Sequence, residues 1–217
     1  MSNSKSSLAT SLSALALVLF WTFSVAAQQT QFASGSTRAT TLAPSSISTI
    51  STLYASDPIA HSLCFADGKE GGVINGGAVF NRCSHIEFDN YKAGNLSVGI
   101  EGGELGRILD LGTAADLSKE YGYEETVGKG QGFASIEFRD GKLLIVKDRR
   151  AGTRQDLTEG ARLFEPSRGM SSAEAKAGHI YLARITDSHS KDFQILVKLL
   201  VLTASPGESV TFRWELL

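Results

Sequence analysis

Two polar residues inside one short apolar stretch are the first candidates for chemistry. His85 and Glu87 are separated by a single residue in the segment from His85 to Phe88, which predicts a strand. Side chains two positions apart in a strand project from the same face. An imidazole and a carboxylate would then stand together as the start of a metal site or as an acid/base pair. An exposed polar strand face explains the spacing as well.

A second group of ligand types gathers in the polar segment DSHSKD. Its Asp187, His189 and Asp192 combine carboxylate oxygens with an imidazole, which suits a divalent cation. Hairpin turns also select such polar residues for their backbone geometry alone.

Carboxylates for glycoside hydrolysis are numerous. That reaction needs two carboxyl groups held about 5 to 10 Å apart across a cleft, and one sequence does not show which pair meets the condition. The candidates are Glu101, Glu104, Asp110, Glu124 and Glu125.

Aromatic residues supply one candidate binding patch. Tyr121 and Tyr123 lie in the loop-like segment EYGYEE, among glutamates, where exposed rings would contact a ligand. Trp214 belongs to an alternating apolar set and is expected in the core.

Several classes of function are disfavoured. The chain has no G-x-S-x-G, H-E-x-x-H, G-x-x-x-x-G-K-[ST] or D-x-D-x-D-G motif. Its formal net charge of -2 offers no electrostatic footprint for nucleic acid. No cofactor is expected.

The chain has two cysteines, Cys64 and Cys83. In an oxidising compartment a disulfide between them is expected. Two buried thiols or a metal site are the alternatives, and the neighbouring His61 and His85 do not complete a metal-binding spacing.

The N-terminal residues 1–27 predict a signal peptide. The apolar run from Leu12 to Phe23 is shorter than the roughly 20 residues of a membrane span, and Val25 to Ala27 places small residues at a cleavage site. An uncleaved anchor is the alternative. We expect an extracytoplasmic protein, secreted or periplasmic, with no stable membrane span after cleavage.

Two further segments follow. Residues 28–56 are rich in Ser, Thr and Ala and predict a disordered leader, with a short helix around Ile47 to Tyr54 as the exception. Residues 57–217 predict a single β-rich domain.

The C-terminal part carries the strongest strand signals. The segments 179–186, 193–203 and 209–217 are apolar or alternating and are separated by polar turns, which predicts a three-strand antiparallel meander. Segments 135–139 and 142–147, joined at Asp140-Gly141, predict a hairpin. Shorter β-like pieces are 72–80, 85–88, 96–100 and 106–111, and short helices are expected at 113–120, 156–164 and 171–176.

These patterns indicate an all-β, mainly antiparallel fold, a β-sandwich or partly open barrel. Three functions from different classes fit. The favoured hypothesis is an exported, non-enzymatic module that binds a surface carbohydrate or protein, because catalytic signatures are missing. The alternatives are a small secreted hydrolase, acid/base or metal assisted, and a structural envelope protein with an open edge strand or an exposed apolar patch.

Overall fold

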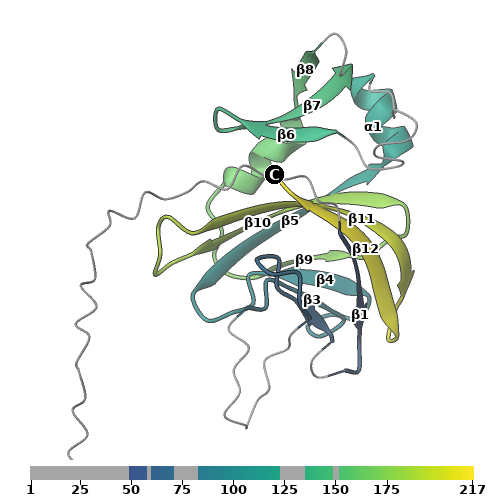
Figure 1. The fold of residues 1–217 in the computed structure, drawn as a ribbon, viewed down its shortest axis with the longest axis vertical. Coiled ribbons are helices and arrows are strands. Elements are labelled where there is room, and N and C mark those ends of the chain that lie inside the picture. The colour runs from purple at the N-terminus through teal and green to yellow at the C-terminus, as the bar shows by residue number, and fades with distance from the viewer. Residues whose placement is uncertain (1–48, 58–59, 71–82, 123–134, 149–151) are drawn as a thin grey trace, which may run out of the picture. The chain divides into compact units, whose positions relative to one another are not determined.

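Antiparallel strands make up most of the folded chain, as the sequence predicted (Figure 1). The computed structural model describes residues 49–57, 60–70, 83–122, 135–148 and 152–217. All of them belong to one compact unit, residues 42–217. The predicted signal peptide and most of the predicted leader lie outside the described residues. Within these ranges, no helix has the length and apolar character needed to cross a membrane.

The largest sheet has five strands and contains the predicted meander. Its order is β1, β12, β11, β10, β5, and every neighbouring pair is antiparallel. The strands are β1 (Thr49–Tyr54), β12 (Ser209–Leu216), β11 (Gln194–Ser205), β10 (His179–Asp187) and β5 (Glu104–Thr113).

Two smaller sheets and two helices make up the rest of the described elements. One sheet has four strands in the order β2 (Ser62–Leu63), β3 (Ile86–Phe88), β4 (Asn95–Val98) and β9 (Ser171–Glu174). The other contains β6 (Ile136–Arg139), β7 (Lys142–Asp148) and β8 (Thr153–Asp156). The helices are α1 (Ala114–Tyr121) and the 3-10 helix η1 (Thr158–Phe164).

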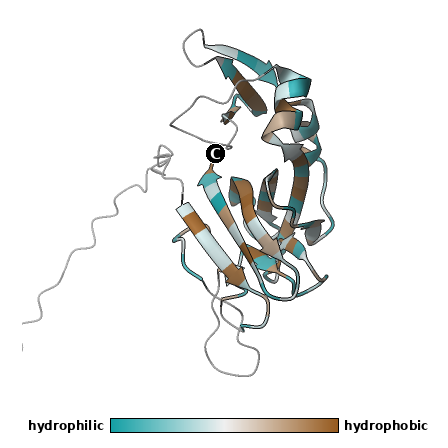
Figure 2. Cartoon of the chain, turned by 90° about the vertical axis from the view of Figure 1, so that its right-hand side faces the viewer, coloured by the Kyte–Doolittle hydropathy of each residue, from teal (hydrophilic) through white to brown (hydrophobic). Residues whose placement is uncertain are grey.

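The five-stranded sheet is covered on both faces, and β11 shows why. Its Val197, Leu199 and Val201 join a first core cluster with side chains of β3 and β4. Leu200, an even-numbered position between these odd-numbered ones, joins a second core cluster with residues of α1, β6 and β7. Side chains of a strand alternate between faces, so β11 is a buried central strand, as predicted. Figure 2 shows the resulting alternation of hydrophobic and hydrophilic residues along the strands.

Local sequence signals explain the predicted hairpin and helix. Asp140 and Gly141 between β6 and β7 both have positive φ, 51° and 77°, as a two-residue type I′ turn requires. Thr113 caps α1 by accepting a hydrogen bond from the Asp116 N–H, and Gly122 ends the helix in the left-handed conformation.

The other two helix predictions need correction. Residues 171–176 were expected to be helical, but Ser171–Glu174 is strand β9, paired with β4. Its side chains alternate between half-buried and exposed, and a helix of one turn has no stability of its own to oppose this pairing. Residues 156–164 contain a helix of the 3-10 type that begins only at Thr158. The predicted piece 72–80 lies outside the described residues.

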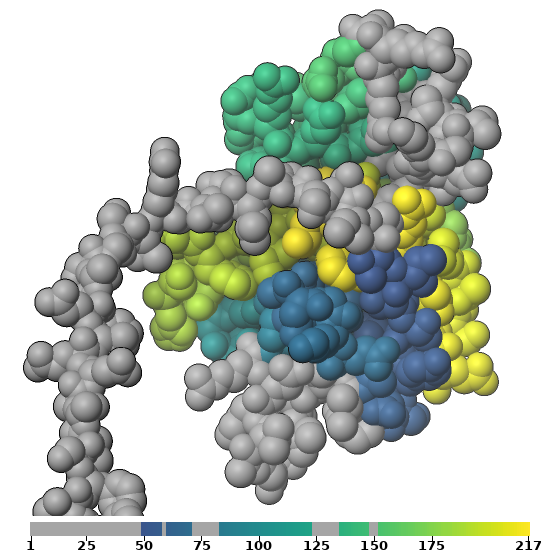
Figure 3. All heavy atoms as spheres, in the orientation of Figure 1, coloured from purple at the N-terminus to yellow at the C-terminus, as the bar shows by residue number. Residues whose placement is uncertain are grey.

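The C-terminal end of the predicted leader also needs correction. Residues 49–54 form β1, an edge strand on β12, with Leu53 facing Val210 in the register. Figure 3 shows this dark blue segment beside the yellow C-terminal strands. The spacing of Ile50 and Leu53 suggested a helix face, but in the strand Leu53 is fully buried and Ile50 is 62% exposed. Pairing with β12 satisfies backbone groups that a short isolated helix leaves open.

Candidate functional site

His85 lies immediately before β3 and is 3% exposed. The backbone N–H of Phe65 donates a hydrogen bond to its Nδ1 at 3.1 Å. Nδ1 is therefore unprotonated, and the proton of the neutral ring sits on Nε2. Burial lowers the pKa of His85 to about 4, although the charge of Asp67 opposes this shift. The ring is consequently a neutral hydrogen-bond donor at ordinary pH.

Two groups lie near Nε2. Oε1 of Glu104, the first residue of β5, lies 3.7 Å away. Sγ of Cys83 lies 3.5 Å away. Cys83 is joined to Cys64 in the disulfide that the sequence predicted. His85 thus stands between a carboxyl group and the disulfide.

Glu104 and Glu101 form a carboxyl pair beside His85. Burial raises the pKa of Glu104 to about 7, and the charge of Glu101 adds to the shift. Glu101 accepts a 2.7 Å hydrogen bond from the N–H of Ser84. Burial also raises the pKa of Glu101, while this hydrogen bond lowers it. Glu104 therefore keeps its proton into the neutral range, beside the Glu101 carboxylate.

These groups line one pocket of about 280 Å³, which we call the Glu104 pocket. Asp187 reaches it because it faces Glu104 in the pairing of β10 with β5. Phe193 adds a half-buried ring whose centroid is 5.9 Å from that of His85. The remaining lining residues are Ala66, Cys83 and Gly102. The pocket therefore combines charged acceptors, neutral donors and one aromatic ring.

A glycine allows the two turns at the pocket to pack together. Gly103 has φ of 103°, and a Cβ there would lie 2.5 Å from Cδ2 of His189. Its carbonyl oxygen accepts a 2.8 Å hydrogen bond from the N–H of Ser188. The polar segment DSHSKD, predicted as a cation site, thus brings Asp187 to the pocket. Asp192 is not among the lining residues.

His85 and Glu87, which the sequence suggested as a pair, have different partners in the structure. Glu87 is 2% exposed and accepts a 2.7 Å hydrogen bond from Asn90. His61 lies beside Glu87, with Nε2 to Oε1 at 3.6 Å. A metal at Nε2 of His85 would force the proton onto Nδ1, against the N–H of Phe65. The hydrogen bond from Phe65 therefore favours a role of His85 as a hydrogen-bond donor through Nε2 and disfavours a role as a metal ligand.

The disulfide also bears on metal binding. Ligand atoms of Cys64, Cys83 and His85 lie within 4.8 Å of one another. Metal ligation by cysteine requires the thiolate, and both sulfurs are held in the disulfide. In this oxidised form Cys83 and His85 belong to the wall of the Glu104 pocket.

The predicted tyrosine patch is placed differently from the expectation of exposed rings. Tyr121 is the last residue of α1 and only 3% exposed. It follows Leu117 by four residues, so both side chains fall on one helix face, and both join the second core cluster. Tyr123 lies outside the described residues.

Sequence reasoning missed one further pair. Nδ1 of His179 lies 2.8 Å from Oδ1 of Asp110, across the pairing of β10 and β5. Both side chains are about a quarter exposed, at 24% and 26%. Lys176 also approaches the same carboxylate, at 3.6 Å. Only the order of strands in the sheet would have revealed this contact.

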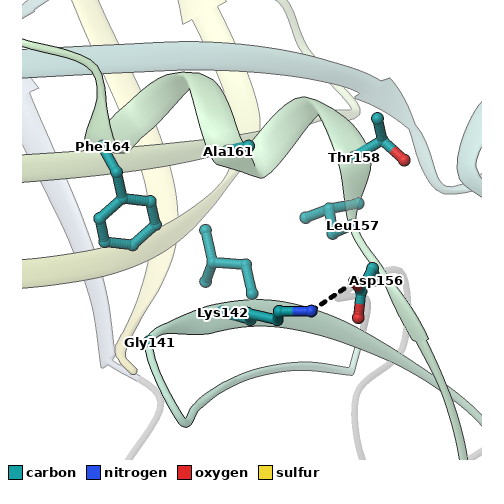
Figure 4. A pocket seen from close by; sticks show the side chains of 8 residues that line it. Gly141, Lys142, Asp156, Leu157, Thr158, Ala161 and Phe164 are labelled. Atoms are coloured by element: carbon teal, nitrogen blue, oxygen red, sulfur yellow. Dashed lines mark hydrogen bonds and ion pairs between the residues drawn. The ribbon is translucent and has the colours of Figure 1, made fainter.

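A larger pocket, about 390 Å³, lies between β7 and η1 (Figure 4). Leu143, Leu157 and Phe164 give it an apolar lining, and the amine of Lys142 is 3.1 Å from the Asp156 carboxylate. Both side chains of this ion pair are exposed to solvent. The pocket offers apolar contact, whereas the Glu104 pocket holds the groups suited to acid/base chemistry.

Comparison with known proteins gives no function for either pocket. No family model, curated protein or solved structure matches the chain. Function is therefore inferred from the geometry of the chain itself.

Proposed function

We propose that this protein is an exported, non-enzymatic β module that binds a surface carbohydrate in the Glu104 pocket. The observation that carries the proposal is the mixture of groups on the pocket wall. Neutral Glu104 and the Nε2–H of His85 are donors, whereas Glu101 offers a carboxylate acceptor. A sugar hydroxyl donates and accepts hydrogen bonds, so it suits such a wall.

Size and apolar contact support a sugar of limited extent. Ligand pockets commonly measure about 300 to 1,000 Å³, so a pocket of about 280 Å³ suits one sugar residue at the end of a chain. The half-buried ring of Phe193 provides an apolar surface for the C–H face of that residue.

Export is part of the proposal. The disulfide between Cys64 and Cys83 supports it, because disulfides persist mainly in oxidising compartments outside the cytoplasm. The predicted signal peptide is the second support.

A thermal-shift screen of the purified protein tests the proposal. The probes are soluble oligosaccharides, with divalent metals and a chelator as separate arms. A ligand at 100 times its Kd stabilises the folded state by about 2.7 kcal/mol. We expect an oligosaccharide to raise the Tm of the wild type and of Glu208→Gln, an exposed control, but not of Glu101→Gln. The proposal fails if no oligosaccharide acts, or if Glu101→Gln responds like the control.

A small hydrolase is the second candidate, favoured by one observation. Glu104, with a pKa of about 7, stands beside Glu101, and a carboxyl group that keeps its proton near neutral pH suits general acid catalysis. Glu104→Gln keeps a donor but has no transferable proton. Mass spectrometry of an incubated oligosaccharide decides: cleavage by the wild type and none by Glu104→Gln supports the hydrolase, whereas an intact oligosaccharide supports the binding module.

A further inference from the structure

Two arginines face each other on neighbouring strands, three residues along from the pairing of Glu104 with Asp187. Arg107 of β5 and Arg184 of β10 are direct partners in the antiparallel pairing. Their side chains therefore project from the same face of the sheet. Like charges directly opposite each other are destabilising in a sheet. The repulsion between the two guanidinium groups therefore persists unless nearby groups supply negative charge.

The negative charge in the surroundings is limited. Glu165 is the carboxylate near Arg107, with Nη1 to Oε2 at 3.5 Å and the glutamate side chain 58% exposed. Arg184 contacts neutral groups: Nε donates to Gln194 at 2.9 Å, and the guanidinium carbon lies 5.1 Å from the centroid of the Phe164 ring. Among the residues that the structure describes, two guanidinium charges thus face one solvent-exposed carboxylate.

Both arginines line one pocket of about 250 Å³, which we call the arginine pocket. Thr186 contributes a hydroxyl group to the same wall. Nε of Arg107 is buried and has no hydrogen-bond partner among the described residues. Such an orphaned donor costs free energy unless an acceptor reaches it. Burial also lowers the pKa of Arg184, which is the effect expected of a poorly compensated charge.

We propose that the arginine pocket binds an oxyanion, the carboxylate, phosphate or sulfate group of a ligand. Guanidinium groups recognise such anions through paired, charge-assisted hydrogen bonds. An anion here relieves the repulsion between Arg107 and Arg184. Glu165 competes with it for Arg107.

Calorimetric titration of the purified protein tests this site, with inorganic phosphate, sulfate and acetate as probes at ionic strength matched with chloride. We expect at least one probe to bind. Arg107→Gln weakens its affinity at least tenfold, and Arg139→Gln, an exposed arginine on β6, leaves it unchanged. Tighter phosphate or sulfate binding identifies a tetrahedral anion, and tighter acetate binding identifies a carboxylate.

Glu165→Gln separates a specific site from a general salt effect. Removing the competing carboxylate tightens binding severalfold if the anion occupies the arginine pocket. Because Glu165 is exposed, its replacement leaves the fold intact, which a Tm measurement checks. The proposal is overturned if no probe binds, or if Arg107→Gln and Arg139→Gln have the same affinity as the wild type.

Discussion

Nε2 of His85 lies 3.7 Å from Oε1 of Glu104, yet burial moves the pKa values of these two groups in opposite directions. The pKa of His85 falls to about 4, and that of Glu104 rises to about 7. At pH 5 to 6 both groups are consequently neutral. The contact has the distance of an ion pair, but over this range it joins a neutral donor to a protonated carboxyl group.

The stability of the protein should depend on Glu104 in a defined pH window. Its carboxyl group titrates near 4.5 when unperturbed and near 7 in the folded chain. The unfolded chain loses this proton first, so the contribution of Glu104 to the free energy of unfolding falls as pH rises from about 4.5 to 7. Glu104→Gln removes that fall. Chemical denaturation should show the variant gaining about 3 kcal/mol over the wild type between pH 4 and pH 8.

Two features make this comparison specific. His85, with its lowered pKa, adds an opposite slope between about pH 4 and 6.5, but it is present in both proteins and cancels in the difference. Glu208→Gln, an exposed control, should follow the wild type at every pH. A constant difference between Glu104→Gln and wild type from pH 4 to 8 would show that Glu104 titrates normally.

β1 should contribute to the stability of the fold. Leu53→Ala removes a fully buried side chain from the first core cluster and should cost about 2 to 5 kcal/mol. Ile50→Ala, three residues away and 62% exposed, should change stability by less than about 0.5 kcal/mol. Urea denaturation of the two variants compares them directly. Equal, small effects would mean that residues 49–54 behave as a tail.

Short-range patterns predicted the meander and the hairpin because their signals lie within the elements themselves. Alternation in β12 and the Asp140-Gly141 turn needed no knowledge of distant residues. β1 and β9 were missed because short polar segments become strands only when a partner strand is available, here β12 and β4.

The same limit applied to the candidate site. Glu101, Glu104 and Asp187 were each identified as carboxylates, but their meeting depends on the register of β5 with β10. His85 was identified with Glu87, its neighbour in sequence, whereas its contact is Glu104. Tyr121 was expected to be exposed because its helix was predicted to end one residue too early.

Loss of the disulfide should destabilise the fold. The bond closes a loop between residues 19 positions apart, which corresponds to roughly 3 kcal/mol in the chain-entropy account. Cys64→Ser combined with Cys83→Ser should lower the free energy of unfolding by about that amount. Reduction of the wild type should lower it similarly. Unchanged electrophoretic mobility on reduction would contradict the presence of the bond.

Gly103 should tolerate substitution far less than its neighbour. Gly103→Ala forces a Cβ onto a residue with positive φ and into His189, at a cost of about 1 to 3 kcal/mol. Gly102→Ala meets no atom within 4 Å and should be nearly neutral. Thermal unfolding of both variants gives the comparison. Equal Tm values would mean that the two turns do not pack as described.

The most direct test of the Glu104 pocket is the pKa of Glu104 itself, measured by NMR on protein labelled with ¹³C at the glutamate carboxyl carbons. One resonance should titrate near pH 7 and be absent from the spectrum of Glu104→Gln. A Glu101→Gln spectrum should move that titration toward lower pH, because the charge of Glu101 contributes to the shift. If every glutamate titrates near its ordinary value of about 4.5, then Glu104 does not hold a proton in the pocket, and the account of its chemistry is wrong.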